Sequence, residues 1–307
     1  MIESLQNPWV KKVVSLHQAK GRKESGLILV EGPHAIQEAL SSKAAKNGLI
    51  LEKLFLLEGQ PLSCLNLSDA LQAHCSSRLE RVASAVMKKM STTETPPPLL
   101  GLFRLEKALL EASSDLETPS STPSSDTIMQ SILALNTAPC WVVLDRLQDP
   151  GNVGTIIRSA LAFGASGVIT TQNTVDVYSP KVIRSSTGLV FSCSVLESEL
   201  RLKGLIESIL VPAGLAVYVG VGHSDTPDYR SCDFKKPMAL ILGQEGQGIS
   251  AEVLEQQQNL NIQGVRIPME NGVESLNVSI SAAVMLAEIH TQRMRSVASS
   301  LIYKDNN

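Results

Sequence analysis

The chain has 307 residues, of which 43% are hydrophobic and 19% are charged, and its formal net charge at pH 7 is −3. This length exceeds that of a usual single domain and predicts two domains, and the composition is ordinary for a globular protein with hydrophobic cores. No stretch approaches the ~20 apolar residues that a helix needs to cross a bilayer, which excludes a helical membrane protein.

The cysteines predict a reducing compartment. They are scattered along the chain without a CxxC pair, at Cys64, Cys75, Cys140, Cys193 and Cys232. Such spacing indicates free thiols and argues against a zinc site, so we expect no metal. The first residues lack the apolar core of a secretory signal and the Arg/Ser-rich character of a transit peptide. We therefore expect a cytoplasmic protein.

The charge is unevenly distributed along the chain. Residues 1–107 carry 14 Lys and Arg against 10 Asp and Glu, whereas residues 140–307 carry 13 against 16. The positive excess is concentrated at the front, within thirteen positions that hold Lys11, Lys12, Lys20, Arg22 and Lys23. A cluster of this kind can neutralise the phosphates of a nucleic acid. On charge alone, a solvated helix face is the simpler interpretation.

A stretch rich in serine and proline divides the chain. Eleven of the fifteen residues at 113–127 are Ser, Thr or Pro, a composition that cannot bury enough apolar surface to fold. We therefore expect a flexible linker over residues 108–138. It separates a front domain at 1–107 from a back domain at 139–307.

The front domain shows alternating helical and strand patterns. The expected helices cover residues 8–19, 34–46, 65–74 and 84–90, and the expected strands cover 26–30, 54–57 and 101–105. This alternation favours an α/β sandwich.

The back domain shows the clearer pattern. Strands are expected at 141–145, 167–170, 191–195, 216–219, 239–242 and 262–267, and helices at 154–163, 198–210, 250–258 and 277–293. Apolar strands with intervening helices predict a largely parallel sheet that is covered on both faces. The last helix is apolar nearly all round, so it is expected to be buried within the domain or against a partner.

Three loops follow strands of this sheet, where ligands of α/β proteins collect. In the first, residues 145–154, Pro150 and Gly151 force a turn and Asn152 is expected to cap the next helix. Arg158 lies in the first turns of that helix. It is a candidate functional residue, or alternatively an ion-pair partner of Asp145 or Asp149.

The second and third loops also combine glycines with polar residues. Residues 242–249 hold glycines in the order G-x-x-G-x-G, which let a ligand approach the backbone, with Glu245 among them. Residues 267–277 bring Ser275 and Asn277 to the start of the last helix. There, free N–H groups favour electron-rich partners, although each side chain taken singly is better explained as a simple helix cap.

Together and in this order, the three loops resemble the signature motifs of the SpoU/TrmH family of RNA ribose methyltransferases, in the knotted SPOUT superfamily. The motif N-x-G-x-I-x-R-S/T-A-x-A-F-G matches residues 152–164. The motif L-G-x-E-x-x-G matches 242–248, and I-P-M followed by S-L-N-V-S matches 267–269 and 275–279. One departure is Asn271, where the family usually has glycine; Asn tolerates positive φ, so we expect the turn to survive.

The front domain is similar, more loosely, to the family's substrate-binding domain, which resembles ribosomal-protein-type RNA binders. The similarity rests on four short stretches, at residues 7–8, 20–23, 30–32 and 91–95. The resemblance therefore implies a smaller α/β/α RNA-binding domain ahead of a deep trefoil-knotted parallel sheet. The linker is longer than expected for the family.

The resemblance also implies a cofactor, a partner and an oligomeric state. Gly243, Ile267 and Leu276 should contact S-adenosylmethionine, chiefly through backbone groups. The basic cluster of the front domain should bind RNA, with ribosomal RNA favoured over transfer RNA on analogy alone. The family forms dimers with the active site near the interface, and an apolar final helix suits a homodimer.

The implied reaction is attack of a ribose 2′-hydroxyl on the sulfonium methyl group. Because arginine stays protonated in proteins, we expect Arg158 to stabilise the developing alkoxide rather than to accept its proton. Glu245 should orient Arg158 and Asn277. Asn152 and Ser275 should place the ribose.

Two other functions fit parts of the sequence. A non-catalytic RNA-binding or ribosome-assembly factor on the same fold would not need to retain Arg158, Glu245, Ser275 and Asn277 together. A nicotinamide-dependent Rossmann enzyme fits the α/β pattern, but its glycines run G-x-G-x-x-G and follow an early strand, which disfavours it here.

Overall fold

The structure is a computed structural model that describes residues 1–61, 75–106, 125–134, 138–221, 226–244, 246, 248–255, 260, 262–270 and 273–304. The chain divides into two compact units. The front unit comprises Met1–Glu117 and Asp176–Ser192, and the back unit comprises Thr118–Val175 and Cys193–Asn307. The helix expected over 65–74 and most of the Ser/Pro-rich stretch lie outside the described residues.

The front unit is built on a four-stranded mixed sheet with strand order β1-β4-β2-β3. Strand β4 runs antiparallel to both β1 and β2, whereas β3 runs parallel to β2. The described elements of this unit are α1 (Pro8–Ser15), α2 (Ala19–Ser25), β1 (Leu27–Glu31), α3 (Pro33–Ala39), α4 (Ser42–Lys46), β2 (Leu49–Leu57), β3 (Leu79–Val82), α6 (Ser84–Met90), β4 (Leu99–Leu105), α9 (Pro180–Ser185) and η3 (Leu189–Ser192).

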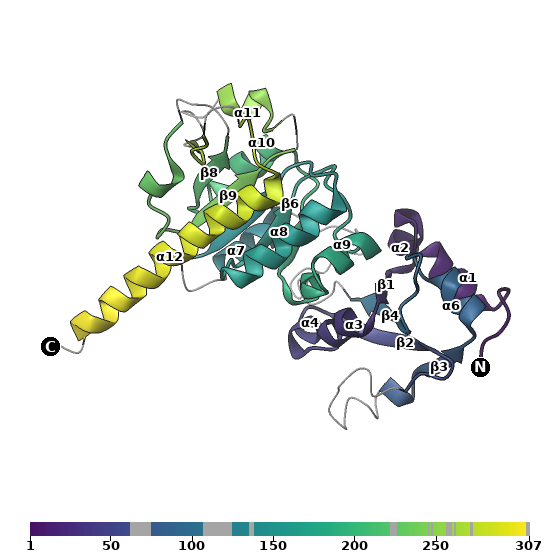
Figure 1. Ribbon diagram of the computed structural model, residues 1–307. Helices are drawn as coiled ribbons and strands as arrows, with labels where there is room; N and C mark the ends of the chain where they lie inside the picture. Colours follow the sequence, from purple (N-terminus) through teal and green to yellow (C-terminus); the bar gives the residue numbers. More distant parts are fainter. Residues whose placement is uncertain are drawn as a thin grey trace. The chain divides into compact units, whose positions relative to one another are not determined.

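Helices cover both faces of this sheet. Alternate strand residues such as Leu29 and Phe55 share one hydrophobic core with α1 and α6, which lie side by side in Figure 1. On the other face, α3 packs on β1 and β4, and α4 packs on β2. The expected α/β/α arrangement is therefore present. The single helix expected over residues 8–19 is wrong, because the chain turns after α1 and starts α2 at Ala19.

A segment from the back half of the sequence belongs to the front unit. Residues Asp176–Ser192 carry α9 and η3, and these pack on β1, α3 and α4. The division into domains at 107 and 139 placed this segment with the back domain. The expected strand at 191–195 is also wrong, because residues 189–192 form a 3₁₀ turn and the strand starts at Val195.

The back unit contains an entirely parallel six-stranded sheet with strand order β10-β8-β9-β5-β6-β7. Its described elements are α7 (Ser125–Leu133), β5 (Cys140–Leu144), α8 (Pro150–Ala162), β6 (Gly167–Thr170), β7 (Val195–Glu197), α10 (Leu202–Leu205), η4 (Ile206–Leu210), β8 (Ala216–Gly220), η5 (Tyr229–Ser231), β9 (Met238–Leu242), α11 (Ala251–Glu255), β10 (Ile262–Val265) and α12 (Val278–Lys304).

Both faces of this sheet are covered, as expected. One face packs against α7, α10, η4 and α11 in a single hydrophobic core. Helices α8 and α12 pack against each other and run side by side in Figure 1. Helix α12 is not buried on all sides within its own chain. Leu286 and Ile289 are buried, whereas Ile280 and Met294 are half exposed.

Part of the expected linker is a helix. Ile128 and Ile132 of α7 are 1% and 2% exposed and belong to the core of the back unit. The expectation of a flexible linker over residues 108–138 is therefore wrong for residues 125–133. The Ser/Pro-rich stretch at 113–127 that motivated it ends just before two isoleucines at i and i+4, which are enough to anchor one amphipathic helix.

The described cysteines Cys75, Cys140, Cys193 and Cys232 are free and buried. Burial raises the pKa of the Cys140 thiol to about 11 and that of the Cys193 thiol to about 12. Thiols with such pKa values are unreactive at neutral pH, so both serve as core residues. Among the described helices, none is long and apolar enough to cross a membrane.

Candidate active site

A cavity of about 500 Å³ lies at the carboxyl ends of β8 and β9. Its walls also include the segment that follows β10, the loop that precedes α12, and the first turns of α12. The volume is in the range of small-molecule sites, and the carboxyl edge of a parallel sheet is where such sites form. Gly243, Ile267 and Leu276, the three residues expected to hold a cofactor, all line it.

The second loop closes on itself at the cavity wall. The amide of Gly248 donates to the carbonyl of Gln244 at 2.7 Å, and Gly246 and Gly248 adopt positive φ angles of 78° and 63°. A Cβ atom on Gly243 would lie 2.6 Å from the carbonyl carbon of Gly248. The loop therefore requires glycine at position 243, because only a bare backbone allows the strand end and the turn to approach so closely.

The first and third loops meet through two asparagines. The side-chain Nδ2 of Asn277 donates to Oδ1 of Asn152 at 3.1 Å. The Oδ1 atom of Asn277 accepts from the amide of Ser279 at 2.9 Å, so this residue also caps α12. Both sequence interpretations of Asn277, a site residue and a helix cap, thus describe the same side chain.

Asn152 itself is not the cap of its helix. Helix α8 begins at Pro150, and the carboxylate of Asp149 accepts the amide of Gly151 at 3.2 Å. The expectation that Asn152 caps a helix starting near Gly154 is therefore wrong. Asn152 lies in the first turn of α8, 8% exposed, with its side chain facing the third loop.

The remaining expected site residues differ in how the structure places them. Ser275 lines the cavity and is exposed. Glu245 and the departure at Asn271 lie outside the described residues. The described lining of the cavity does not include Arg158, which is exposed on α8. Six residues separate it from Asn152, about 9 Å along the helix and about 240° around it, so the two side chains leave α8 in different directions.

Arg146 is a candidate site residue that the sequence analysis did not identify. Its backbone is in the left-handed region with a φ of 56°, which is uncommon for a residue with a side chain. Its Nε donates to the buried carboxylate of Asp145 at 3.0 Å, and its Nη2 donates to the carbonyl of Gly248 at 3.3 Å. Arg146 therefore connects the first loop to the glycine turn at the cavity, and it engages Asp145, which was a proposed partner of Arg158.

The expected RNA-binding cluster divides into two kinds of residue. Lys11, Lys12, Lys20 and Lys23 are exposed on α1 and α2. Arg22 is only 8% exposed, and its guanidinium donates to Asp176 and to the carbonyl of Leu16. The expectation that Arg22 contacts RNA is corrected accordingly, because its polar atoms are engaged inside the front unit.

Comparisons with known proteins identify both parts of the chain. The model of the SpoU rRNA Methylase family matches residues 139–287, and the MRM3-like substrate binding domain matches residues 7–101. The first match includes all three loops around the cavity, and the second includes the basic residues of α1 and α2.

Relatives extend over nearly the whole chain. An uncharacterized tRNA/rRNA methyltransferase of Synechocystis sp. is 36% identical over 294 residues, 95% of this chain and 94% of its own. The 23S rRNA (guanosine(2553)-2′-O)-methyltransferase RlmP of Bacillus subtilis is 30% identical over 285 residues, 93% of this chain and 97% of its own. The crystal structure of an AdoMet-bound rRNA methyltransferase from Sinorhizobium meliloti superposes with a TM-score of 0.71 at 26% identity, covering 94% of this chain and 97% of that one.

Proposed function

Because the chain belongs to the SpoU rRNA methylase family, we propose that it methylates a ribose 2′-hydroxyl of ribosomal RNA at the cavity of the back unit. The family resemblance of the three loops is confirmed, and the chain is an S-adenosylmethionine-dependent RNA 2′-O-methyltransferase. A nicotinamide-dependent enzyme is thereby excluded. The observation that carries the proposal is that the second and third loops line one cavity, and that Asn152 of the first loop is hydrogen-bonded to Asn277 in the wall of that cavity.

The cavity fits S-adenosylmethionine on its own geometry. The backbone of Gly248 packs so closely on Gly243 that no Cβ atom fits there, and this tight turn forms a wall, the cradle, of a cavity with about 500 Å³ of space. Leu276, Met269 and Met285 provide apolar surface for an adenine ring, while exposed backbone groups of the loops provide polar contacts. Gly243, Ile267 and Leu276 would hold the cofactor, which supplies an electrophilic methyl group on a positively charged sulfur.

The residues of the chain would act by positioning and by electrostatics. Asn152 and Ser275 would hold the ribose, and Asn277 would fix Asn152 through their hydrogen bond. Holding two reactants in line can remove roughly 7–11 kcal/mol of the barrier. Arg158 keeps its proton and would stabilise the negative charge that develops on the 2′-oxygen. Glu245 is proposed to orient Arg158 and Asn277.

We also propose that the enzyme is a homodimer whose second copy completes the site. Arg158 is exposed and does not line the described cavity of its own chain, so a further surface has to bring substrate and guanidinium together. On α12, Ile280 and Met294 are 50% and 56% exposed, which is apolar surface that a second copy would cover. Sedimentation equilibrium should give a dimer, and Ile280→Glu with Met294→Glu should give an inactive monomer. A fully active monomer would contradict this proposal.

Ribosomal RNA is the proposed substrate, and the cytoplasm is the proposed location. The front unit matches a substrate-binding domain, and its exposed lysines on α1 and α2 offer contacts to phosphates. The buried free thiols fit a reducing compartment. The deep trefoil knot implied by the family stays a prediction.

The substrate proposal is tested by methyl transfer from tritiated S-adenosylmethionine to purified ribosomal or transfer RNA. We expect label in ribosomal RNA, at a single ribose that loses its methylation in cells without the protein. Label confined to transfer RNA would show that transfer RNA is the substrate in place of ribosomal RNA. Absence of label on either RNA, with intact cofactor binding, would favour the non-catalytic assembly factor.

A further inference from the structure

The segment Asp176–Ser192 is attached to the rest of the front unit by a partly buried ion pair at its beginning. Nε and Nη2 of Arg22 donate to Oδ2 of Asp176 at 2.8 and 2.6 Å, and Nη1 donates to the carbonyl of Leu16 at 2.6 Å. The side chain of Arg22 is 8% exposed and that of Asp176 is 21% exposed. The three nitrogens of one guanidinium thus connect α1, α2 and the start of the segment.

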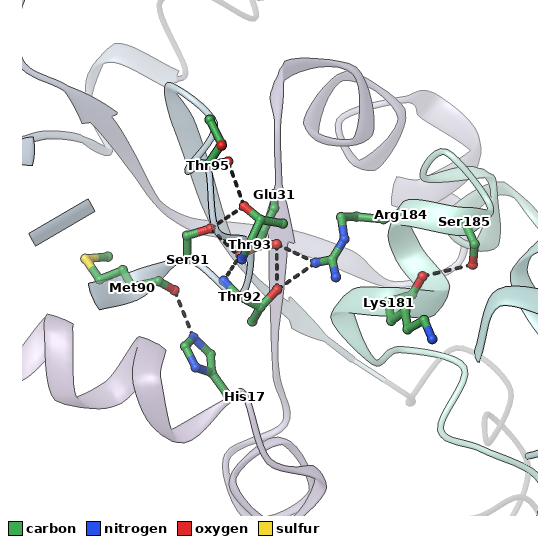
Figure 2. A network of polar contacts seen from close by, with 10 residues as sticks. All are labelled: His17, Glu31, Met90, Ser91, Thr92, Thr93, Thr95, Lys181, Arg184 and Ser185. Atoms are coloured by element: carbon green, nitrogen blue, oxygen red, sulfur yellow. Dashed lines mark hydrogen bonds and ion pairs between the residues drawn. The ribbon is translucent and has the colours of Figure 1, made fainter. Parts of the chain in front are cut away.

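A second polar link lies at α9 and is shown in Figure 2. The side chain of Glu31, at the end of β1, is 1% exposed. Its Oε2 accepts from Nη1 of Arg184 at 2.5 Å, and its Oε1 accepts from the amide of Thr92 at 2.6 Å. The same Nη1 also donates to Oγ1 of Thr92 at 2.6 Å, and that hydroxyl donates to Glu31 at 2.8 Å. The hydrogen-bonding needs of a buried carboxylate are therefore met jointly by Thr92 and by Arg184 of the segment.

The end of the segment fits the front unit in shape. Gly188 has a positive φ of 84°, and a Cβ atom there would lie 2.9 Å from the Cα atom of Ala35 in α3. Nδ2 of Asn47 donates to the carbonyl of Phe191 at 2.8 Å. The segment is therefore an integral layer of the front unit, and it contacts helices α3 and α4 as well as β1.

These contacts explain the stretches of the front domain that resembled the family. Arg22 lies in the stretch at 20–23, Glu31 in the stretch at 30–32, and Thr92 in the stretch at 91–95. Each of the three side chains bonds to Asp176 or belongs to the network of Arg184. The polar residues that make these stretches recognisable therefore serve to hold a piece of the back half of the sequence.

The segment is also bonded, just before it begins, to the first loop of the active site. In the back unit, the amide of Val175 donates to the carbonyl of Leu147 at 2.9 Å, and Oγ1 of Thr174 accepts the amide of Arg146 at 3.1 Å. This loop leads directly into α8 and Asn152. One short stretch of chain therefore joins the layer within the front unit to the loop that carries catalytic candidates.

We propose that Arg22, Glu31, Thr92 and Arg184 are positioning residues for methyl transfer. They dock the segment Asp176–Ser192 in the front unit. One ordered stretch of chain then connects the front unit, which holds the RNA, to the first loop of the active site. The proposal rests on the proposed function, because it takes RNA as the substrate. None of the four residues lines the described cavity. Substitution of these residues should lower kcat, whereas the affinities for RNA and for the cofactor should stay unchanged.

The test compares Arg184→Ala with wild type in the full-length protein. We expect kcat on ribosomal RNA to fall about tenfold, whereas the KM for RNA stays within twofold because the exposed lysines are unchanged. The dissociation constant of S-adenosylmethionine, measured by calorimetry, should also stay within twofold. Hydrogen exchange should quicken at the α9 amides of Ile183 and Ser186, which bond within the segment.

Lysine variants separate positioning from general destabilisation. Arg184 makes both of its contacts through a single nitrogen, Nη1, so Arg184→Lys should recover most of the lost kcat. Arg22 uses three nitrogens, so Arg22→Lys should behave like Arg22→Ala. The matched control is Arg104→Ala, which removes a partly exposed ion pair with Glu52 in the same unit and should leave kcat unchanged.

Several outcomes would overturn the proposal. An Arg184→Ala variant whose kcat equals that of the Arg104→Ala control would do so. A loss of cofactor affinity in Arg184→Ala that accompanies the loss of kcat would also do so. Failure of Arg184→Lys to recover activity, if Arg184→Ala does not fold, would also count against it. If wild type transfers no methyl group to RNA, the proposed function fails separately. The hydrogen-exchange comparison then still decides whether the four residues dock the segment.

Discussion

The front and back units both carry short polar stretches that stand out in the sequence, but the structure uses them in opposite ways. In the front unit, Glu31 and Arg22 are buried and their polar atoms are engaged within the unit. In the back unit, Ser275 is exposed and lines a cavity, and Arg158 is exposed on α8. A polar side chain that is buried and saturated stabilises its fold, whereas one that is left accessible beside a cavity is available to a substrate.

The back unit also contains residues that serve both purposes. Asn277 caps α12 with its oxygen and holds Asn152 with its nitrogen. Arg146 links two loops at the cavity from a strained backbone position. Strain of this kind persists only where the surrounding structure enforces it, and it is concentrated at functional sites. The comparison between the units therefore predicts different responses to substitution, from loss of chemistry to small changes in stability.

The largest effect is expected at Arg158. If its exposed guanidinium stabilises the charge on the 2′-oxygen, Arg158→Ala should lower kcat by about 10²–10³-fold, as removal of an oxyanion-stabilising group does. Cofactor affinity should change by less than about twofold, since Arg158 does not line the described cavity. Arg201→Ala, at another exposed arginine of the back unit, is the control. A kcat close to that of wild type would remove Arg158 from the mechanism.

A matched pair of glycines tests the cradle. Gly243→Ala places a Cβ atom 2.6 Å from the backbone of Gly248, so the turn must shift. An overpacking cost of about 1–3 kcal/mol corresponds to roughly 5- to 150-fold weaker binding of S-adenosylmethionine. Gly248→Ala meets no atom within 4 Å and only strains a φ of 63°, at about 1 kcal/mol of stability. Equal cofactor affinities of the two variants by calorimetry would refute the cradle.

Substitutions of Asn277 should separate its two roles. Asn277→Ala removes the helix cap, at about 1 kcal/mol, and should lower Tm by about 2–4 °C. Asn277→Asp keeps the capping oxygen beside the positive end of α12, so its Tm should be higher than that of Asn277→Ala. Both variants lose the Nδ2 donor to Asn152, worth about 1 kcal/mol, so both should show about fivefold lower kcat. An Asp variant with unchanged kcat would show that this hydrogen bond is dispensable.

A comparably small effect is expected at Arg146. Arg146→Ala and Arg146→Gly both remove the contacts with Asp145 and Gly248, and each should weaken cofactor binding about fivefold, from the loss of about 1 kcal/mol. Only glycine relieves the strain of the positive φ. The free energy of unfolding of Arg146→Gly should therefore be about 1 kcal/mol higher than that of Arg146→Ala. Urea unfolding measures this difference. Arg230→Ala, which removes an exposed pair with Asp228, controls for loss of charge.

Patterns within short windows of sequence determined much of the back unit. The apolar stretches at 167–170 and 239–242 became β6 and β9, because strands buried on both faces need continuous apolar residues. The glycines of the second loop predicted that a ligand can approach the backbone closely, and the structure shows a close approach of backbone to backbone there, between Gly243 and Gly248. Local chemistry sufficed for these features because each depends on neighbours within a few residues.

Tertiary structure alone decided which polar residues are buried in contacts within the protein and which stay accessible. No spacing in the sequence pairs Arg22 with Asp176, 154 positions later, or Glu31 with Arg184. The same limit applies to Arg146, whose partner Gly248 is 102 positions away. Burial and charge pairing arise from contacts between distant parts of the chain. A sequence window that reveals a strand therefore cannot tell whether an arginine beside it will meet a phosphate or a carboxylate of its own protein.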